Sequence, residues 1–402
     1  MTTTSRGGPL AGVRVLEITK VWAGPYAGKL LAYLGAEVIK VESNTNLDEM
    51  RAYGGVDIDN APYFLSLNPE ILSVQVNMKT EEGLQLVRDM IAKSDIVLNN
   101  IRPGAMERSG LGYEDMKKLK ADIISVSMKM YGNEGPLGYQ TGYAPCFAAL
   151  GGLNYLIGYE GEAPTGSNIR YGDTTLGAGA AFAAITALVH RERTGEGQFV
   201  DVSAVETMAS LVGDSLFEQA VTGRSPAADS NRHADMAPHG CYPCAHDAWI
   251  SLAVASEAEW RALCDILGAA ELATDPRFAD MAARQTNLAA LDEEIGRLTR
   301  PHEAAVLAQR LLAVGVGAFK SLSSLELVSD EELWRRDFYR IVSDHNAGTR
   351  PIIGAPWRMS RTQATITNGA PALGEHNAYV YREVLGLSQE RYEALVAEKV
   401  ID

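Results

Sequence analysis

The sequence predicts an α/β fold that consists of a large Rossmann-like domain, built on a parallel sheet, and a smaller α+β domain. The first observation is an alternation of short apolar runs with helical stretches between residues 13 and 128, which is typical of a mostly parallel sheet covered by helices. The second is a change of character after about residue 220, where helices rich in alanine, leucine and glutamate dominate. The third is the length of 402 residues, which suggests two or three domains.

The first predicted unit consists of a strand, a helix and a second strand. Residues 13–18 alternate apolar and polar side chains and are predicted to form a strand, which a turn follows at 21–25 (VWAGP). Residues 26–34 then form a helix that ends at Gly35, and residues 37–41 form the next strand. Because such units almost always join parallel strands through a right-handed crossover, we expect both strands in one parallel sheet.

The same alternation continues along the chain. A helix begins at Thr80, with glutamates in its first turn where the helix dipole favours them, and strands follow at 96–98 and 123–128. Residues 174–189 form a helix rich in alanine and glycine. At 16 residues this helix is short for a membrane span, so we expect it to be buried inside the protein.

Domain boundaries follow from composition. Residues 222–238 are rich in Gly, Ser, Pro, Asn and Asp, and they are predicted to form a linker or a long loop. We therefore predict the N-terminal part of the large domain at 1–224, a small domain at 225–330, and a linker with a C-terminal return to the large domain at 331–402. The small domain is expected to carry a strand at 249–254 ahead of its helices.

The net charge excludes a large class of partners. The chain carries 36 Lys and Arg against 51 Asp and Glu, which gives a formal net charge of −15 at pH 7. Binding of nucleic acid through bulk electrostatics needs a basic surface instead. The N-terminal residues contain no apolar signal segment, and four cysteines indicate no disulfide framework. We therefore expect a cytoplasmic enzyme that binds neither nucleic acid nor a membrane.

One short run offers possible metal ligands. His239, Cys241, Cys244 and His246 lie within eight residues, but structural zinc sites normally take ligand pairs from two separated segments. The run precedes an apolar strand and can itself be extended, which would turn alternate side chains to opposite faces. We therefore expect no metal site. The chain also lacks the glycine-rich motifs of dinucleotide and P-loop nucleotide binding.

The sharpest candidate for chemistry is Asp173, in the run RYGDTTLG at 170–177. A lone aspartate before a long helix is typical of an N-cap, which accepts backbone hydrogen bonds. The same carboxylate, kept ionised by the helix dipole in a glycine-flanked turn, can also act as a nucleophile towards an activated acyl group. From these residues alone, both interpretations stand.

Several short segments, in order along nearly the whole chain, carry a family resemblance. They are residues 9–16 (PLAGVRVL), 23–25 (AGP), 34–42 (LGAEVIKVE), 102–104 (RPG), 111–113 (LGY), 132–136 (GNEGP), 193–203 (RTGEGQFVDVS), 354–356 (GAP) and 373–376 (LGEH). Together they resemble class III CoA-transferases of the CaiB/BaiF type. The resemblance implies an α/β fold that assembles as interlocked dimers, in which each chain passes through the ring of the other.

The resemblance also implies a mechanism with Asp173 as the catalytic residue. Asp173 would attack an acyl-CoA thioester to give a mixed anhydride and CoA thiolate. The returning thiolate would then give an aspartyl-CoA thioester and release the donor acid, after which an acceptor carboxylate reverses the sequence. CoA thioesters are therefore expected as substrates, with no permanently bound cofactor.

Several further positions are implied to bind CoA. The resemblance places Asn100 and Arg108 near the CoA pocket and Tyr143 beside the active site. From the residues alone, Asn100 is equally a turn residue and Arg108 a solvated helix residue. Basic residues common in the family are absent at 43–45 (SNT) and 68–73 (NPEILS), which removes expected contacts to the CoA phosphates.

Lys129 and Arg170 are predicted to replace those contacts, unless a partner subunit holds CoA. Trp22, Cys146 and Phe147 are predicted to line an apolar acyl pocket. Such a pocket favours an aromatic or branched dicarboxylic acceptor with succinyl-CoA as donor, and the stretches around it resemble benzylsuccinate CoA-transferases in particular.

Two alternatives stay open. Acyl-CoA racemases of the same family pair a histidine with the aspartate as two acid/base groups, but Tyr143 stands near the position of that histidine, which removes one partner. The chain can also be a non-catalytic subunit of a heteromeric transferase. The missing basic residues favour that role, and the presence of Asp173 opposes it. The expected protein partner is a second copy of the chain or a related subunit.

Overall fold

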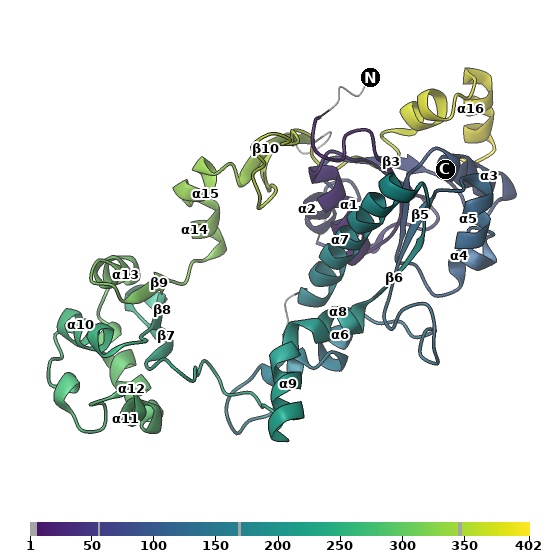
Figure 1. Ribbon diagram of the computed structural model, residues 1–402. Helices are drawn as coiled ribbons and strands as arrows, with labels where there is room; N and C mark the ends of the chain where they lie inside the picture. Colours follow the sequence, from purple (N-terminus) through teal and green to yellow (C-terminus); the bar gives the residue numbers. More distant parts are fainter. Residues whose placement is uncertain (1–5, 55–56, 168–169, 345–347) are drawn as a thin grey trace. The chain divides into compact units, whose positions relative to one another are not determined.

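The chain divides into two compact units. The computed structural model describes residues 6–54, 57–167, 170–344 and 348–402. The larger unit comprises the described residues of Met1–Leu156, Pro164–Pro226 and Glu331–Asp402, and the smaller unit comprises Ile157–Ala163 and Ala227–Asp330. Figure 1 follows the chain through both units.

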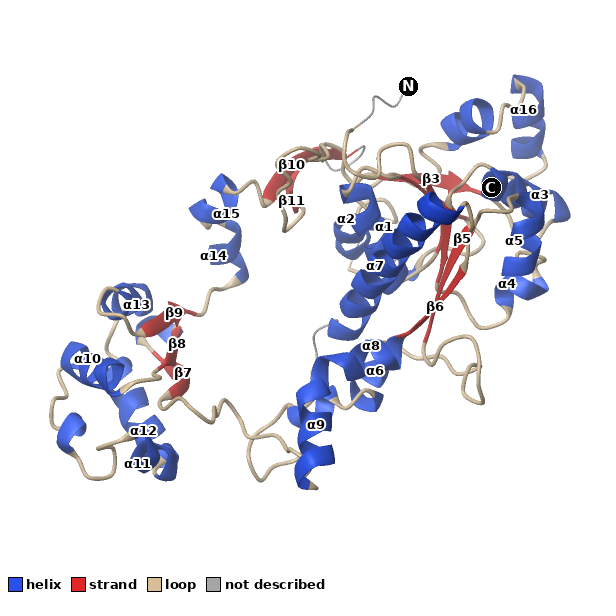
Figure 2. Cartoon of the chain, viewed as in Figure 1, coloured by secondary structure: helices blue, strands red, loops and turns tan. Residues whose placement is uncertain are grey.

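The larger unit is built on a six-stranded parallel sheet in the order β3-β2-β1-β4-β5-β6 (Figure 2). The strands are β1 (Arg14–Ile18), β2 (Glu37–Glu42), β3 (Ile71–Gln75), β4 (Ile96–Asn99), β5 (Ile124–Lys129) and β6 (Phe199–Ser203). This order is that of doubly wound folds, in which the direction of winding reverses between β1 and β4. The predicted Rossmann-like parallel sheet is confirmed, and β3 and β6 are two strands that were not predicted from the sequence.

Helices cover both faces of this sheet. One face packs against α1 (Ala23–Tyr33) and α7 (Tyr171–Thr194), and the other packs against α3 (Glu81–Ala92), α5 (Tyr113–Leu119) and the C-terminal α16 (Gln389–Ala397). Alternate residues of one strand serve the two cores: Val15 packs with α1 and α7, and its neighbour Leu16 packs on the opposite face. Parallel strands buried on both faces are the rule in this architecture.

The remaining elements of the larger unit lie at its edges. They are η1 (Glu49–Arg51), α2 (Pro62–Leu67), α4 (Ala105–Arg108), α6 (Ala144–Leu150), η2 (Leu153–Leu156), α8 (Ala204–Ala209), η3 (Ser210–Val212), α9 (Gly213–Thr222), α15 (Glu331–Arg335), the antiparallel hairpin of β10 (Tyr339–Asp344) and β11 (Gly348–Ile353), and a π-helix at Tyr379–Val384.

Two helix boundaries differ from the predictions. The first helix begins at Ala23 rather than at residue 26, so the predicted turn at 21–25 is shorter and Pro25 lies in the first helical turn, where no backbone hydrogen bond is lost. The alanine-rich helix α7 spans 24 residues rather than 16 and ends at Gly195, whose φ of 76° suits a residue without Cβ. Within the described part of the chain, α7 is long and apolar enough to cross a membrane by length and composition alone. It packs against α1, β5 and β6 inside the unit, as expected for a core helix.

α1 and α7 approach one another closely through a glycine. A Cβ placed on Gly177 would lie 2.5 Å from the carbonyl oxygen of Ala23 and 3.1 Å from Cδ1 of Tyr26. Backbone atoms cannot move away as the end of a flexible side chain can. The distance between the two helices therefore depends on the absence of a side chain at this position.

Two glycine-to-alanine substitutions in α7 are expected to change stability in opposite directions. Gly177→Ala should lower the free energy of unfolding by about 1–3 kcal/mol because the new methyl group has no room. Gly179→Ala is the matched control, since its Cβ would meet only Cγ2 of Thr207 at 3.7 Å. The control should raise stability by about 0.5–1 kcal/mol through the better helix propensity of alanine. Urea unfolding of the two variants measures the difference, and equal effects would contradict the close packing of α1 on α7.

The smaller unit is an α+β layer, as predicted. Its sheet is antiparallel in the order β7-β8-β9, with β7 (His239–Pro243), β8 (Trp249–Ala253) and β9 (Gly317–Lys320). The helical elements are η4 (Ala245–Asp247), α10 (Glu257–Leu267), η5 (Leu272–Thr274), α11 (Met281–Thr286), α12 (Leu288–Thr299), α13 (Ala304–Leu312) and α14 (Ser324–Val328). They enclose a core around Trp260, Phe278 and Leu291.

The run of cysteines and histidines forms the edge of this sheet. β7 is extended from His239, and the exposed Cys241 Sγ lies 3.3 Å from Oγ of Ser251 on β8. Cys244 follows the strand and is buried. Among the residues that the structure describes, no group of three or more His, Cys, Asp or Glu side chains is arranged to hold a metal ion.

Candidate active site

The candidate site lies where β1 and β4 end, at the point of the sheet where the winding reverses. Ligands of doubly wound folds bind at the carboxyl ends of the strands at this point. Asn100 follows β4 and clamps the residue after β1: its Oδ1 accepts from the backbone N–H of Lys20 at 2.9 Å, and its Nδ2 donates to the Lys20 carbonyl at 2.7 Å. Because both ends of the amide are engaged, Asn100 fixes the shape of this edge.

The turn between β1 and α1 is strained. Val21 has a φ of 67°, a left-handed conformation that a β-branched residue adopts at a cost of about 1–3 kcal/mol. Its backbone N–H donates to Oδ1 of Asp48 at 3.0 Å, which holds the strained conformation in place. Strained residues of this kind cluster at functional sites.

Asp48, which binds the turn, belongs to a buried ion cluster. Nζ of Lys40 lies 2.9 Å from Oε1 of Glu17, its partner across β1 and β2, and 3.1 Å from Oδ2 of Asp48. All three side chains are excluded from solvent. Burial alone would lower the pKa of Lys40, but the two carboxylates outweigh it and raise that pKa above its usual range. Glu17 is one of the polar positions in the alternating pattern that predicted β1. Its side chain is nevertheless buried and pairs with Lys40.

Trp22, the next residue, connects this turn to α7. Its indole Nε1 donates to Oγ1 of Thr174 at 3.2 Å, and this hydrogen bond joins the start of α1 to the first turn of α7. Asp173 is the neighbour of Thr174. The structure therefore brings together Trp22 and Asp173, two site residues predicted from distant parts of the sequence.

Asp173 is the third residue of α7 and does not cap it. The N-cap position belongs to Arg170, and no side chain makes a capping hydrogen bond there. The side chain of Asp173 is half-buried, and burial raises its pKa to about 6, against which the nearby Arg170 acts to lower it. The predicted N-cap role is therefore wrong, and desolvation outweighs the expected support from the helix dipole. The carboxylate is still largely ionised at pH 7 and is poorly solvated, which makes it a better nucleophile.

The first turn of α7 rests on α6. A Cβ placed on Gly172 would lie 3.0 Å from the Ala144 carbonyl oxygen and 3.2 Å from Cδ2 of Phe147, so the two helices pack closely at this glycine. Phe147 is buried and lies against the first turn of α7 at Gly172. Tyr143 occupies the N-cap of α6 and is exposed, as is Cys146.

Arg170 lies over two aromatic rings near Asp173. Its guanidinium carbon is 4.7 Å from the ring centroid of Trp22 and 4.7 Å from that of Tyr63. The two rings meet edge to face, with centroids 6.0 Å apart. Tyr63 belongs to α2 and was not predicted as a site residue.

Lys129 ends β5 in a row of polar side chains that crosses the carboxyl ends of β4 and β5. Its Nζ donates to Oδ1 of Asn99 at 2.8 Å, and Oγ of Ser127 lies 3.2 Å from the same oxygen. Burial lowers the pKa of Lys129 to about 8, which Glu107 and Asp201 partly oppose. Arg108, in contrast, is exposed on α4 and donates to the Pro103 carbonyl oxygen at 3.5 Å.

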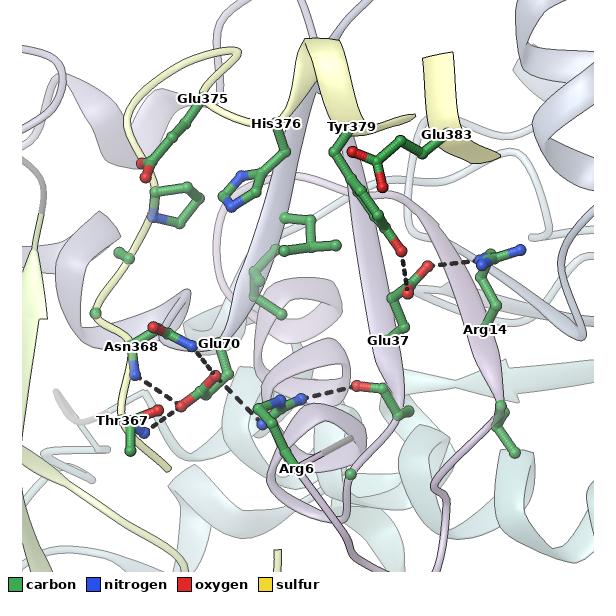
Figure 3. A pocket seen from close by; sticks show the side chains of 18 of the residues that line it. Arg6, Arg14, Glu37, Glu70, Thr367, Asn368, Glu375, His376, Tyr379 and Glu383 are labelled. Atoms are coloured by element: carbon green, nitrogen blue, oxygen red, sulfur yellow. Dashed lines mark hydrogen bonds and ion pairs between the residues drawn. The ribbon is translucent and has the colours of Figure 1, made fainter. Parts of the chain in front are cut away.

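A cavity of about 1070 Å³ lies at the opposite edge of the sheet, where β1, β2 and β3 begin. Figure 3 shows that charged groups lining it pair with one another. Arg14 Nε lies 2.6 Å from Glu37, which also accepts from the Tyr379 hydroxyl at 2.8 Å, and Arg6 lies 3.3 Å from Glu70. The hydrogen bond from Tyr379 to Glu37 joins the C-terminal segment to the sheet, and we assign the cavity no chemistry.

Comparison with known proteins decides the family. A sequence profile of the family described as CoA-transferase family III matches residues 10–377. The chain belongs to CoA-transferase family III. The succinyl-CoA–D-citramalate CoA-transferase of Chloroflexus aurantiacus is 33% identical over 396 residues, which cover 98% of each chain. The succinyl-CoA–L-malate CoA-transferase alpha subunit of the same organism is 30% identical over 405 residues, 98% of this chain and 92% of the relative.

A solved structure agrees with this assignment. The crystal structure of a CaiB/BaiF family protein from Brucella suis superposes with a TM-score of 0.88 at 30% identity, covering 94% of this chain and 100% of that one. The family that the short motifs indicated is confirmed, and so are the predicted fold class and enzyme class. The protein is a class III CoA-transferase.

Three residues of the site were missed from the sequence: Val21, Asp48 and Tyr63. Each acts through a contact across more than 25 positions of the chain, which no local pattern records. Val21 alone carried a signal, because a turn of only a few residues after a strand often requires an unusual backbone conformation.

Proposed function

We propose that this class III CoA-transferase moves CoA from an acyl-CoA donor to a carboxylic acid acceptor through covalent intermediates on Asp173. The observation that supports the proposal is the position of Asp173, half-buried in the first turn of α7 at the reversal point of the sheet, with burial raising its pKa to about 6. A carboxylate in this state is ionised at neutral pH and needs no separate base to attack a thioester.

The reaction proceeds by two exchanges that mirror one another. The Asp173 carboxylate attacks the thioester carbonyl, the C–S bond breaks, and a mixed anhydride forms with release of CoA thiolate. The thiolate attacks the aspartyl carbonyl of the anhydride, which frees the donor carboxylate and leaves an aspartyl-CoA thioester. The acceptor carboxylate then attacks that thioester, and the returning thiolate attacks the acceptor carbonyl and restores the Asp173 carboxylate. No net proton is consumed, and first-turn N–H groups of α7, which have no intrahelical acceptor, can stabilise each oxyanion.

For the substrates, we propose succinyl-CoA as donor and an aromatic or branched dicarboxylate, of the benzylsuccinate type, as acceptor. The named substrates of the two relatives from Chloroflexus include succinyl-CoA with D-citramalate or L-malate, all of them dicarboxylic acyl groups. The indole of Trp22 and the ring of Tyr63 supply apolar surface beside Asp173. A panel in which only small acids such as formate react would exclude the larger acceptors.

CoA itself is proposed to bind along the carboxyl ends of β4 and β5, with Asn100, Lys129, Arg108 and Tyr143 as the contributing residues. The support is the position of Asn100 and Lys129 at these strand ends and the positive charge of Lys129 and Arg108. CoA is a substrate in this scheme and does not remain bound.

We propose that the chain works as an interlocked dimer or as a heteromer with a related subunit, in the cytoplasm. Large apolar side chains of the larger unit are widely exposed, among them Phe182 at 75%, Phe217 at 75% and Val221 at 81%. Such exposure on one chain favours a large interface. One relative is named as an alpha subunit, and all four cysteines here are free. Sedimentation that shows only monomers at micromolar concentration would contradict the dimer.

The intact mass of the protein after incubation with succinyl-CoA tests the covalent mechanism. We expect a mass increase on Asp173 from the succinyl anhydride or the CoA thioester, which hydroxylamine or borohydride converts into a stable mark for peptide mapping. Asp173→Asn treated in the same way is the control and should stay unlabelled. Labelling at any other residue, or no labelling by any thioester that supports turnover, would contradict the proposal.

A further inference from the structure

Arg170 is a cation with an unused hydrogen-bonding edge. Its guanidinium lies over the rings of Trp22 and Tyr63, at 4.7 Å from each centroid. Among the residues that the structure describes, none accepts a hydrogen bond from this guanidinium or forms an ion pair with it. Aromatic rings bind the faces of a guanidinium group, whereas carboxylates bind its edge through two parallel N–H donors. Both rings thus lie against the guanidinium of Arg170, and none of the described residues accepts a hydrogen bond from its N–H donors.

The two rings are themselves held in place, so the guanidinium is preorganised. Trp22 donates to Thr174, and its ring meets Tyr63 edge to face at 6.0 Å. Tyr63 in turn meets Tyr53 edge to face at 6.3 Å. An arginine side chain loses much conformational entropy when it binds an anion. Contact of the guanidinium with the two rings in the free protein reduces that loss.

The position of Arg170 indicates which anion it meets. Arg170 is the N-cap of α7 and Asp173 is the third residue of the helix, and the charge of Arg170 acts on the Asp173 carboxyl group. Asp173 reacts at the carbonyl carbon of the acyl group. The pantetheine arm of CoA places the phosphates far from the thioester. A substrate group that contacts Arg170 while the thioester carbonyl is at Asp173 must therefore belong to the acyl chain.

We propose that Arg170, which lies over the rings of Trp22 and Tyr63, binds the distal carboxylate of a dicarboxylic acyl group whose other carboxyl carbon reacts at Asp173. The inference rests on the proposed function of Asp173 and assigns to Arg170 the choice of dicarboxylic over monocarboxylic substrates. It moves Arg170 from the predicted CoA-phosphate contacts to the acyl end of the site. A monocarboxylic acyl group has no second carboxylate to pair with Arg170, so it lacks this contact and binds less well.

The test compares one pair of acceptors in two variants of the assembled protein. Glutarate and its monoamide, glutaramate, differ only in the charge at the distal end. Arg170→Met keeps the length and apolar stem of the side chain, and Arg193→Met removes an exposed arginine from the far end of the same helix as the control. We expect Arg170→Met to lower kcat/KM about 10- to 100-fold for glutarate and less than about threefold for glutaramate. Arg170→Lys should recover part of the loss, and Arg193→Met should change neither acceptor.

Three results would overturn the inference. An equal loss for both acceptors would make Arg170 a structural residue, and a rise in the KM of every acyl-CoA would assign it to CoA phosphates. If the wild-type protein does not prefer glutarate over glutaramate, there is no selectivity for Arg170 to explain.

A binding measurement separates this inference from the proposed mechanism. Calorimetric titration of glutarate and of glutaramate into the Asp173→Asn variant measures binding and needs no turnover. If glutarate binds more tightly and Arg170→Met abolishes the difference, the carboxylate site stands even where no adduct forms on Asp173. If the adduct forms but the two acceptors bind equally, the mechanism stands and the inference about Arg170 fails.

Discussion

Asp173→Asn is expected to lower the rate of CoA transfer by about a thousandfold or more. An amide cannot form the mixed anhydride, and removal of a covalent nucleophile leaves only the contribution of substrate binding. The measurement is the appearance of the acceptor thioester by chromatography, with substrates at concentrations that saturate the wild-type enzyme. A variant that keeps a tenth of the activity would show that another residue carries the CoA, or that the chain is a non-catalytic subunit.

The stability of the same variant keeps this experiment interpretable. Burial raises the pKa of Asp173 from 3.8 to about 6, so at pH 7 the folded protein holds a carboxylate in an environment that disfavours its charge. The native state binds more protons than the unfolded state between these values, and the contribution of Asp173 to stability is therefore lost as the pH rises through about 6. Asp173→Asn should thus be more stable than wild type at pH 7, by up to about 3 kcal/mol. A stable, inactive variant localises the defect to the chemistry, whereas a destabilised one would attribute it to misfolding.

The pH dependence of transfer should reflect the same group. Above about pH 6 the Asp173 carboxylate is ionised and kcat/KM should be level, and below pH 6 it should fall about tenfold per pH unit. Free carboxylic acid acceptors titrate near pH 4, so they remain ionised over most of this range. Initial rates between pH 4.5 and 8 measure the profile.

A variant checks the assignment of that pH dependence. Arg170 acts to lower the pKa of Asp173, so Arg170→Met should move the fall in rate to higher pH. A profile that stays level down to pH 5, or one that Arg170→Met does not shift, would contradict Asp173 as the titrating nucleophile.

The sequence by itself determined the architecture and the family. Strand–helix–strand patterning predicted the parallel sheet because buried parallel strands are apolar runs and their crossover helices are amphipathic, both of which are local properties. Short motifs from residue 9 to residue 376 identified class III CoA-transferases, and the same resemblance selected Asp173. Without it, the local pattern supported an N-cap equally well, and the structure shows that interpretation to be wrong.

Only the tertiary structure decided the environment of Asp173. The pKa of Asp173 depends on how much solvent the packing of α6 and α7 excludes, and no residue type or spacing encodes that quantity. The same holds for the contact of Arg170 with Trp22 and Tyr63, which joins three segments separated by up to 148 positions. It holds again for the ion cluster of Glu17 and Lys40, whose charges look like surface residues in an alternating strand. Local sequence specifies which elements form, but desolvation and charge pairing are sums over neighbours that only the folded chain brings together.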